Sequence, residues 1–129
     1  MSTESQLTRN LCKRLEKLGC DSFAVVGGKM QAPGWPDRAF FAKGLPGGCA
    51  WVEFKQERGK LSAKQLRVLE RLNKRHVLAV VYRFGSNQFE TCNGNVLCYV
   101  DYKDEKLWLK ELKDCGDTLG CFIEVREDD

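Results

Sequence analysis

Two carboxylic acids and one lysine carry the clearest chemistry in this sequence. Residues 49–55 read CAWVEFK, and since side chains alternate along a β-strand, Glu53 and Lys55 would point to the same face. Asp37 opens an earlier strand-like segment, DRAFFA, directly after a loop rich in glycine and proline. If these two segments pair as neighbouring strands, the carboxylates of Asp37 and Glu53 converge at one edge of a sheet.

Two converging carboxylates suit a hard divalent cation. Mg²⁺ prefers oxygen ligands at roughly 2.0–2.1 Å and retains several waters. We therefore expect Asp37, Glu53 and the main-chain carbonyl of Phe54 to hold Mg²⁺, with Mn²⁺ as a substitute, while Lys55 orients or helps to deprotonate an attacking water. An acid and a lysine two residues apart are also a common pattern on a solvated strand face, and that alternative stays open.

Two amphipathic helices are expected to position these groups. The first, over residues 4–18, begins with capping-box spacing and has Glu4 at the centre of its apolar stripe. The second starts after the N-cap Ser62, runs to about Lys74 and has Gln65 on its inner stripe. The apolar stripe of the first helix consists of Leu7, Leu11, Leu15 and Leu18.

Each of these polar residues has a functional and a structural interpretation. Burying an amide costs free energy unless its donors and acceptors find partners, so Gln65 is expected to face a polar pocket. An ordinary hydrogen-bonded core glutamine is the alternative. Glu4 would aim a carboxylate inward, although an acid in the first turn is also stabilised by the helix dipole.

The remaining elements predict an α/β fold with a mixed central sheet flanked by helices. Strands are expected at residues 23–26, 37–42, 49–55 and 77–84, which with the two helices gives the order α-β-β-β-α-β. The glycines and proline of residues 43–48 suit a hairpin-like connection. Beyond residue 85 the pattern weakens, with a further strand expected at 95–100 and a short helix at 105–114.

Two segments together resemble a known nuclease family. GWPDRAFF and WVEFKQERGKLSAKQ are similar, in order and spacing, to the VRR-NUC branch of the PD-(D/E)XK nucleases. The PD of the motif is Pro36-Asp37, and the ExK ends on Lys55. Gly34-Trp35 matches the glycine and large apolar residue ahead of PD, and residues 59–65 match the GKLSxxQ segment. An acid in the first helix, here Glu4, also fits.

The resemblance implies a restriction-endonuclease-like core over about residues 4–84 of a single domain, 1–129, with a C-terminal extension at 85–129. It implies a Mg²⁺-dependent endodeoxyribonuclease with Asp37, Glu53 and Lys55 at its centre, aided by Glu4 and Gln65. The chain looks like a stand-alone bacteriophage-type member, which implies a homodimer that cuts branched DNA such as Holliday junctions. A flap or other DNA endonuclease or exonuclease, or an inactive nucleic-acid-binding module, remains an alternative.

Contacts with DNA are expected from cations bordering the cleft. These would bind phosphates without reading sequence, although each could equally be an ordinary surface cation. The candidates are Lys29, Arg38, Arg58, Lys60 and Lys64. Trp35 is expected to pack its loop rather than to stack on a base.

Composition narrows the class of protein. A formal net charge of +3 does not by itself establish a nucleic-acid partner. No apolar run is long enough for a membrane helix and no secretory signal is visible, so a cytoplasmic location is expected, in the host cell if the protein is viral. VVGGK lacks the full phosphate-loop pattern, so no nucleotide cofactor is expected. The seven cysteines are expected to be reduced thiols, with a redox or metal-sensing device as the alternative.

Overall fold

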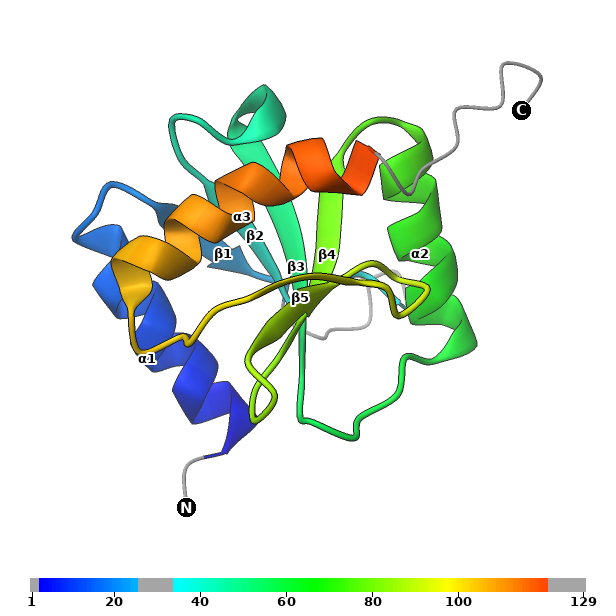
Figure 1. Cartoon of the computed structure of the whole chain (residues 1–129), viewed down its shortest axis with the longest axis horizontal. Coiled ribbons are helices and arrows are strands. Elements are labelled where there is room, and N and C mark those ends of the chain that lie inside the picture. Colours follow the sequence, from blue (N-terminus) through cyan, green and yellow to red (C-terminus); the bar gives the residue numbers. More distant parts are fainter. Residues whose placement is uncertain (1–2, 26–33, 121–129) are drawn as a thin grey trace.

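One mixed sheet of six strands organises the fold. The computed structural model describes residues 3–25 and 34–120. The strands follow one another across the sheet in chain order, β1-β2-β3-β4-β5-β6, and every neighbouring pair is antiparallel except β3 and β4. Helices cover both faces of this sheet (Figure 1). The predicted α/β class, with a mixed sheet flanked by helices, is confirmed.

Helix α1, Glu4–Glu16, starts where the sequence predicts. Thr3 and Gln6 form the complete capping box. The helix ends two residues before the predicted limit because the chain turns back on itself. The N–H groups of Leu18 and Cys20 both bond to the carbonyl of Leu15, at 2.9 and 3.1 Å. Gly19, between them, has a φ of 83°, a conformation that favours glycine at a helix C-terminus.

The first three strands form an antiparallel meander. They are β1 Asp21–Ala24, β2 Arg38–Phe41 and β3 Cys49–Lys55. Strand β1 begins two residues before the predicted start, and Val26, the predicted end, lies outside the described residues. The predicted hairpin-like connection joins β2 to β3 and contains a short 3₁₀ turn, Pro46–Gly48. In this register Arg38 pairs with Val52, which brings the start of β2 beside the end of β3.

A crossover then makes the one parallel pair. Helix α2, Ala63–Lys74, has Ser62 as its N-cap, as predicted, and leads to β4, Leu78–Arg83. Because α2 carries the chain back along the sheet, β4 runs parallel to β3, with Lys55 opposite Arg83. The predicted order α-β-β-β-α-β is confirmed over residues 4–83.

The C-terminal part extends the same sheet. Strand β5, Gln88–Glu90, was not predicted, because three residues are too few to show an alternating pattern. Strand β6, Val96–Tyr99, agrees with the predicted strand. Helix α3, Glu105–Gly120, starts where expected and continues six residues beyond the predicted end.

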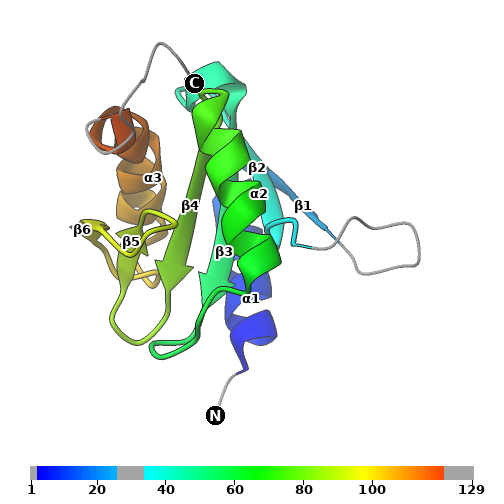
Figure 2. The same ribbon diagram turned by 90° about the vertical axis from the view of Figure 1, so that its right-hand side faces the viewer.

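The core is divided by the sheet into two layers. On one face, Leu11 of α1 and Trp108 of α3 pack with Phe54 of β3 in the larger cluster. On the other face, Leu69 of α2 packs with Val81 in a smaller cluster. Figure 2 shows α2 and α3 on opposite sides of β4. No helix within the described residues is long and apolar enough to cross a bilayer.

Candidate active site

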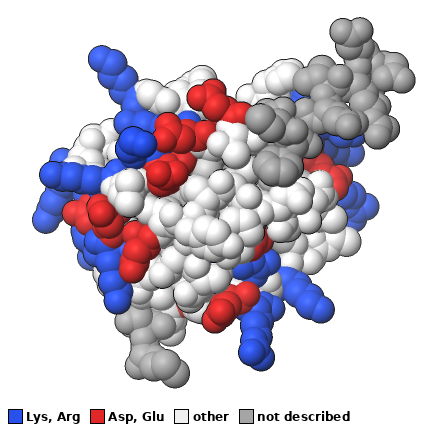
Figure 3. Space-filling view, viewed as in Figure 1, with Lys and Arg blue, Asp and Glu red and all other residues white. Residues whose placement is uncertain are grey.

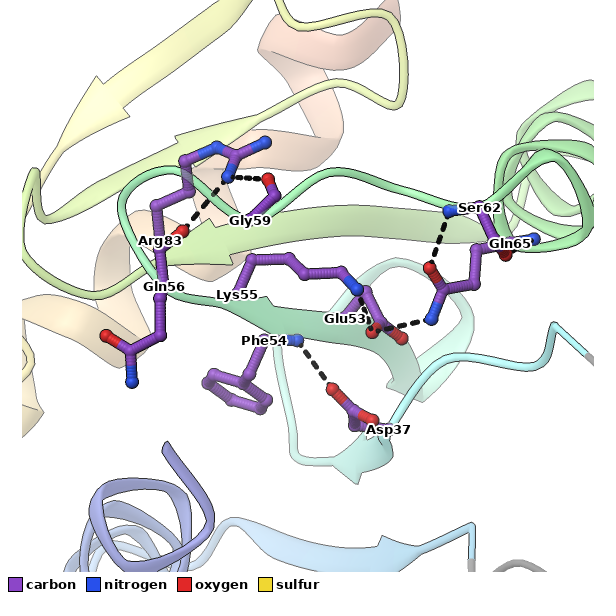
Figure 4. A network of polar contacts seen from close by, with 9 residues as sticks. All are labelled: Asp37, Glu53, Phe54, Lys55, Gln56, Gly59, Ser62, Gln65 and Arg83. Carbon is purple, nitrogen blue, oxygen red and sulfur yellow. Dashed lines mark hydrogen bonds and ion pairs between the residues drawn. The ribbon is translucent and has the colours of Figure 1, made fainter. Parts of the chain in front are cut away.

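Glu53 is a buried acid with one unpartnered oxygen. It lies near the end of β3, on the face that α2 covers, and its residue is 2% exposed. Its Oε2 accepts a hydrogen bond of 3.2 Å from Gln65 Nε2 and lies 3.7 Å from Lys55 Nζ (Figure 4). Its Oε1 is buried and accepts no hydrogen bond of regular geometry, although Asp37 lies within hydrogen-bonding reach of the same carboxyl group. A buried carboxylate oxygen without a partner is costly and calls for an explanation.

Asp37 lies beside Glu53 because its carboxylate takes the place of a main-chain carbonyl in the hydrogen bonding of the sheet. It immediately precedes β2, and its Oδ2 accepts the Phe54 N–H at 2.9 Å. In a β-strand, the N–H and C=O groups of one residue point toward the same neighbouring strand. The Phe54 carbonyl therefore points to the Asp37 side, whereas the next carbonyl, of Lys55, accepts from Phe84 on the β4 side at 2.9 Å.

The two acids repel each other electrostatically. Burial, and after it the negative charge of Asp37, raise the pKa of Glu53 from 4.5 to about 8, while the positive charge of Lys55 partly offsets both effects. A cation placed between two neighbouring carboxyl groups stabilises the ionised form of both. The electrostatics of the pair therefore favour a bound cation.

Glu4 lies within electrostatic reach of the same groups. It is half-buried at the start of α1. Burial raises its pKa first, the charge of Asp37 raises it further, and Lys55 lowers it. The structure thus brings the first helix, the start of β2 and the end of β3 together at one end of the sheet.

Gln65 links α2 to the site. Its side-chain oxygen accepts the N–H of Ser62 at 2.9 Å, and its own N–H donates to the Ser62 hydroxyl at 3.1 Å. Its side-chain Nε2 donates to Oε2 of Glu53. The residue therefore caps the helix with one end of its amide and holds the acid with the other, which accounts for a polar residue on the inner stripe.

The arrangement fits a hard divalent cation. Within residues 3–25 and 34–120, no group of three or more His, Cys, Asp or Glu side chains gathers as a ready-made metal cage. Mg²⁺ does not need one, since it is commonly bound through one or two carboxylates and otherwise by water and substrate phosphate. Asp37, the Phe54 carbonyl and the unpartnered Oε1 of Glu53 are the oxygen donors that such an ion requires.

A largely buried ion pair anchors the turn that follows Lys55, and no local sequence pattern indicated it. Nε of Arg83 donates to both carboxylate oxygens of Glu90 at 2.9 Å. Nη1 of the same arginine donates to the carbonyls of Gln56, at 3.1 Å, and of Gly59 (Figure 4). Arg83 therefore fixes the turn between β3 and α2. Glu90 was missed because it belongs to the unpredicted β5.

The loop ahead of Asp37 is packed closely on α2. Gly34 has a φ of 92°, and a Cβ built there would lie 2.6 Å from the main-chain oxygen of Lys64. Trp35 contacts Trp51, with ring centroids 5.2 Å apart, which agrees with the predicted packing role. Glycine is required at this approach because any side chain would push the loop away from the helix.

The predicted DNA-contacting cations are not all at the site. Arg58, Lys60 and Lys64 are exposed in the turn after β3 and at the start of α2. Arg38 is on the other face of the sheet, where it donates to the Ser22 hydroxyl at 3.3 Å and borders α1. Lys29 lies outside the described residues.

The thiols form no metal site in the described part of the chain. Six cysteines there are free. Burial raises the pKa of Cys12, Cys20 and Cys92, which disfavours the thiolate form that redox chemistry and metal binding require. The alternative of a redox or metal-sensing device therefore gains no support from these three groups.

No protein-family model matches this chain, and no curated protein sequence matches it either. What the protein does must therefore be inferred from the chemistry of these side chains.

Proposed function

We propose that the protein is a metal-dependent nuclease that hydrolyses phosphodiester bonds in DNA. The observation that carries this proposal is the buried, unpartnered Oε1 of Glu53 beside a second carboxylate, Asp37, with Lys55 Nζ 3.7 Å from the opposite oxygen. Acids of this kind without a cation would be a net electrostatic cost to the fold. An acid pair with an adjacent lysine at the end of a sheet suits phosphodiester hydrolysis.

Asp37, Glu53 and the Phe54 carbonyl would hold the metal. When bound, Mg²⁺ would supply charge neutralisation at the phosphate and a bound water of lowered pKa. Lys55 would hold the nucleophilic water through its ammonium group. Gln65 keeps the Glu53 carboxylate oriented, as groups that hydrogen-bond to metal ligands generally do.

We propose that the protein belongs to the PD-(D/E)XK nucleases, with which its fold is compatible, and to their VRR-NUC branch, for which the support is the sequence motifs around Asp37 and at residues 53–65. A restriction-endonuclease-like core would carry its acids on or beside consecutive antiparallel strands, followed by a helix that crosses to a parallel strand. Here Asp37 immediately precedes β2, Glu53 lies in β3, and α2 leads to the parallel strand β4. As the substrate we propose branched DNA such as a four-way junction. As the assembly we propose a homodimer, since two sites would cut two strands.

Cleavage assays with labelled linear, flap and four-way DNA test the proposal directly. The wild type should cut in Mg²⁺ or Mn²⁺ and not in EDTA. Lys55→Ala should lower the rate by roughly 10²-fold or more, the scale of a positioned proton-transfer group. Lys43→Ala, in the exposed turn at the opposite end of β3, removes the same charge and should cut like the wild type.

Two outcomes would redirect the assignment. Binding of DNA with no cleavage in either metal would indicate the alternative, an inactive nucleic-acid-binding module of this fold. Equal cutting by Lys55→Ala and the wild type would remove the lysine from the chemistry. Preference among the three DNAs decides between junction and flap substrates, and light scattering of the protein in solution tests the dimer.

A further inference from the structure

The exposed side of α2 carries a continuous row of cations. Lys64, Arg67, Arg71 and Lys74 recur at intervals of three and four residues, so they lie on one face of the helix. All four are exposed, and the first three border a shallow pocket together with Val68. In the space-filling view, basic side chains project along the right-hand margin of the molecule, beside α2 (Figure 3).

Within the described residues, no acid forms an ion pair with this row. The ion pairs found there join Lys55 to Glu53, Arg83 to Glu90 and Lys110 to Asp114, all away from the row. The one acid in α2, Glu70, forms no ion pair with the row even though Arg67 and Lys74 are three and four residues away. Four positive charges therefore face solvent side by side.

The helix itself does not explain the whole row. Cations near a helix C-terminus are stabilised by the helix dipole, which accounts for Arg71 and Lys74. Lys64 occupies the first turn, where the dipole is unfavourable to a cation, and Arg67 follows in the next turn. The helix dipole therefore does not stabilise the N-terminal half of the row, whereas a bound anion would.

The row begins at the candidate active site. Lys64 is adjacent to Gln65, which holds Glu53, and its carbonyl is packed against Gly34 of the loop that carries Asp37. From Lys64 to Lys74 the helix rises about 15 Å, at 1.5 Å per residue. With about 3.4 Å per nucleotide along one strand of a duplex, this length matches roughly four nucleotides.

We propose that the row of Lys64, Arg67, Arg71 and Lys74 binds the phosphate backbone of one DNA strand leading away from the cleaved bond. This inference rests on the proposed nuclease function and adds a contact surface to it. Binding through phosphates would be independent of base sequence and strongly dependent on salt. The length of α2 from Lys64 to Lys74 would set how many nucleotides beyond the cleaved bond the protein contacts.

Fluorescence anisotropy with a labelled duplex, in EDTA so that no cleavage occurs, tests the surface. The double variant Arg67→Gln/Arg71→Gln should weaken binding 10- to 100-fold near 0.1 M salt, and the slope of log K against log salt should become shallower by about 1.8, or 0.9 per phosphate contact. The matched control Lys103→Gln/Lys106→Gln removes two exposed cations from the opposite side of the sheet and should retain the wild-type slope. Thermal melting checks that both variants fold.

The binding and cleavage measurements separate the two proposals. An unchanged slope in Arg67→Gln/Arg71→Gln, with DNA still cut by the wild type, overturns the inference and leaves the nuclease proposal standing. A shallower slope without cleavage in any metal supports the surface and removes the nuclease. Equal losses in Arg67→Gln/Arg71→Gln and in Lys103→Gln/Lys106→Gln would indicate diffuse charge attraction and also overturn the inference.

Discussion

The side-chain amide of Gln65 donates a hydrogen bond of 3.2 Å to the carboxylate of Glu53, while its carbonyl oxygen accepts the Ser62 N–H at 2.9 Å. One side chain thus couples the start of α2 to the buried acid of β3. Helix position and acid orientation are consequently not independent, and variants can be chosen to separate them.

Replacing Gln65 should slow DNA cleavage by more than the loss of its helix-capping contact explains. Gln65→Met removes both the capping contact and the bond to Glu53, whereas Ser62→Ala removes capping alone. Both should destabilise the fold by about 1 kcal/mol through loss of the cap. Gln65→Met should in addition slow DNA cleavage by roughly 10- to 100-fold, as loss of a group supporting a metal ligand does. Equal cleavage rates in the two variants would reduce Gln65 to a capping residue.

Gly34→Ala should disturb the loop that carries Asp37. The added Cβ would meet the Lys64 carbonyl at 2.6 Å, and the φ of 92° is strained for alanine. Gly19→Ala is the matched control, since its φ is 83° but nothing lies within 4 Å of the added atom. Both changes should cost about 1–2 kcal/mol for the left-handed backbone, measured by chemical denaturation. Cleavage should fall markedly in Gly34→Ala alone; equal activities would show that the contact with α2 does not position Asp37.

The stability of the metal-free protein should fall as pH rises from about 4.5 to 8. Burial and the charge of Asp37 raise the pKa of Glu53 to about 8, so within this window the folded state binds more protons than the unfolded state. Stability then decreases with pH, by up to about 5 kcal/mol for a shift of this size. Denaturation at a series of pH values, in EDTA, measures the slope.

The variant Glu53→Gln supplies the control for this pH effect. It keeps the shape of the side chain without a titratable group, so its stability should fall much less over the same range and should exceed that of the wild type at pH 8. Added Mg²⁺ should raise the melting temperature of the wild type but not that of Glu53→Gln, because a ligand stabilises the state that binds it. Parallel pH profiles for the two proteins would contradict the raised pKa.

Breaking the Arg83–Glu90 pair should destabilise the protein strongly. Removing one partner leaves a buried charge without compensation and should cost about 3–5 kcal/mol. Glu90→Met and Arg83→Met are the single variants, and in the double variant the loss should be well below the sum of the two. Additive losses in this double-mutant cycle would show that the ion pair contributes no coupling.

The same pair should affect catalysis through the turn at Gln56–Gly59. Arg83→Lys keeps the positive charge but loses the planar fork that reaches Glu90 and the two turn carbonyls at once. The cleavage rate of this variant should be lower than that of the wild type even in assays run well below the melting temperature of the variant. A wild-type rate in Arg83→Lys would mean that the turn needs no such anchor.

Local pattern was sufficient to predict the elements that precede residue 84. The capping box at Thr3, the N-cap at Ser62 and the strand at residues 49–55 occur where predicted, because these signals depend on neighbours a few residues apart. Short elements were less predictable. Strand β5 has three residues and owes its place to pairing with β4 and β6, which no local pattern records.

The sequence by itself determined which residues could do chemistry, since residue type and alternation along one strand place Glu53 and Lys55 on a shared face. Only the tertiary structure decided their surroundings. The unpartnered oxygen of Glu53, the Asp37 bond to Phe54 and the Arg83–Glu90 pair all join residues distant in the chain. Strand register and helix packing set these contacts, and burial sets the pKa of Glu53. Neither the contacts nor the burial can be read from local sequence, because both arise when residues distant in the chain pack together.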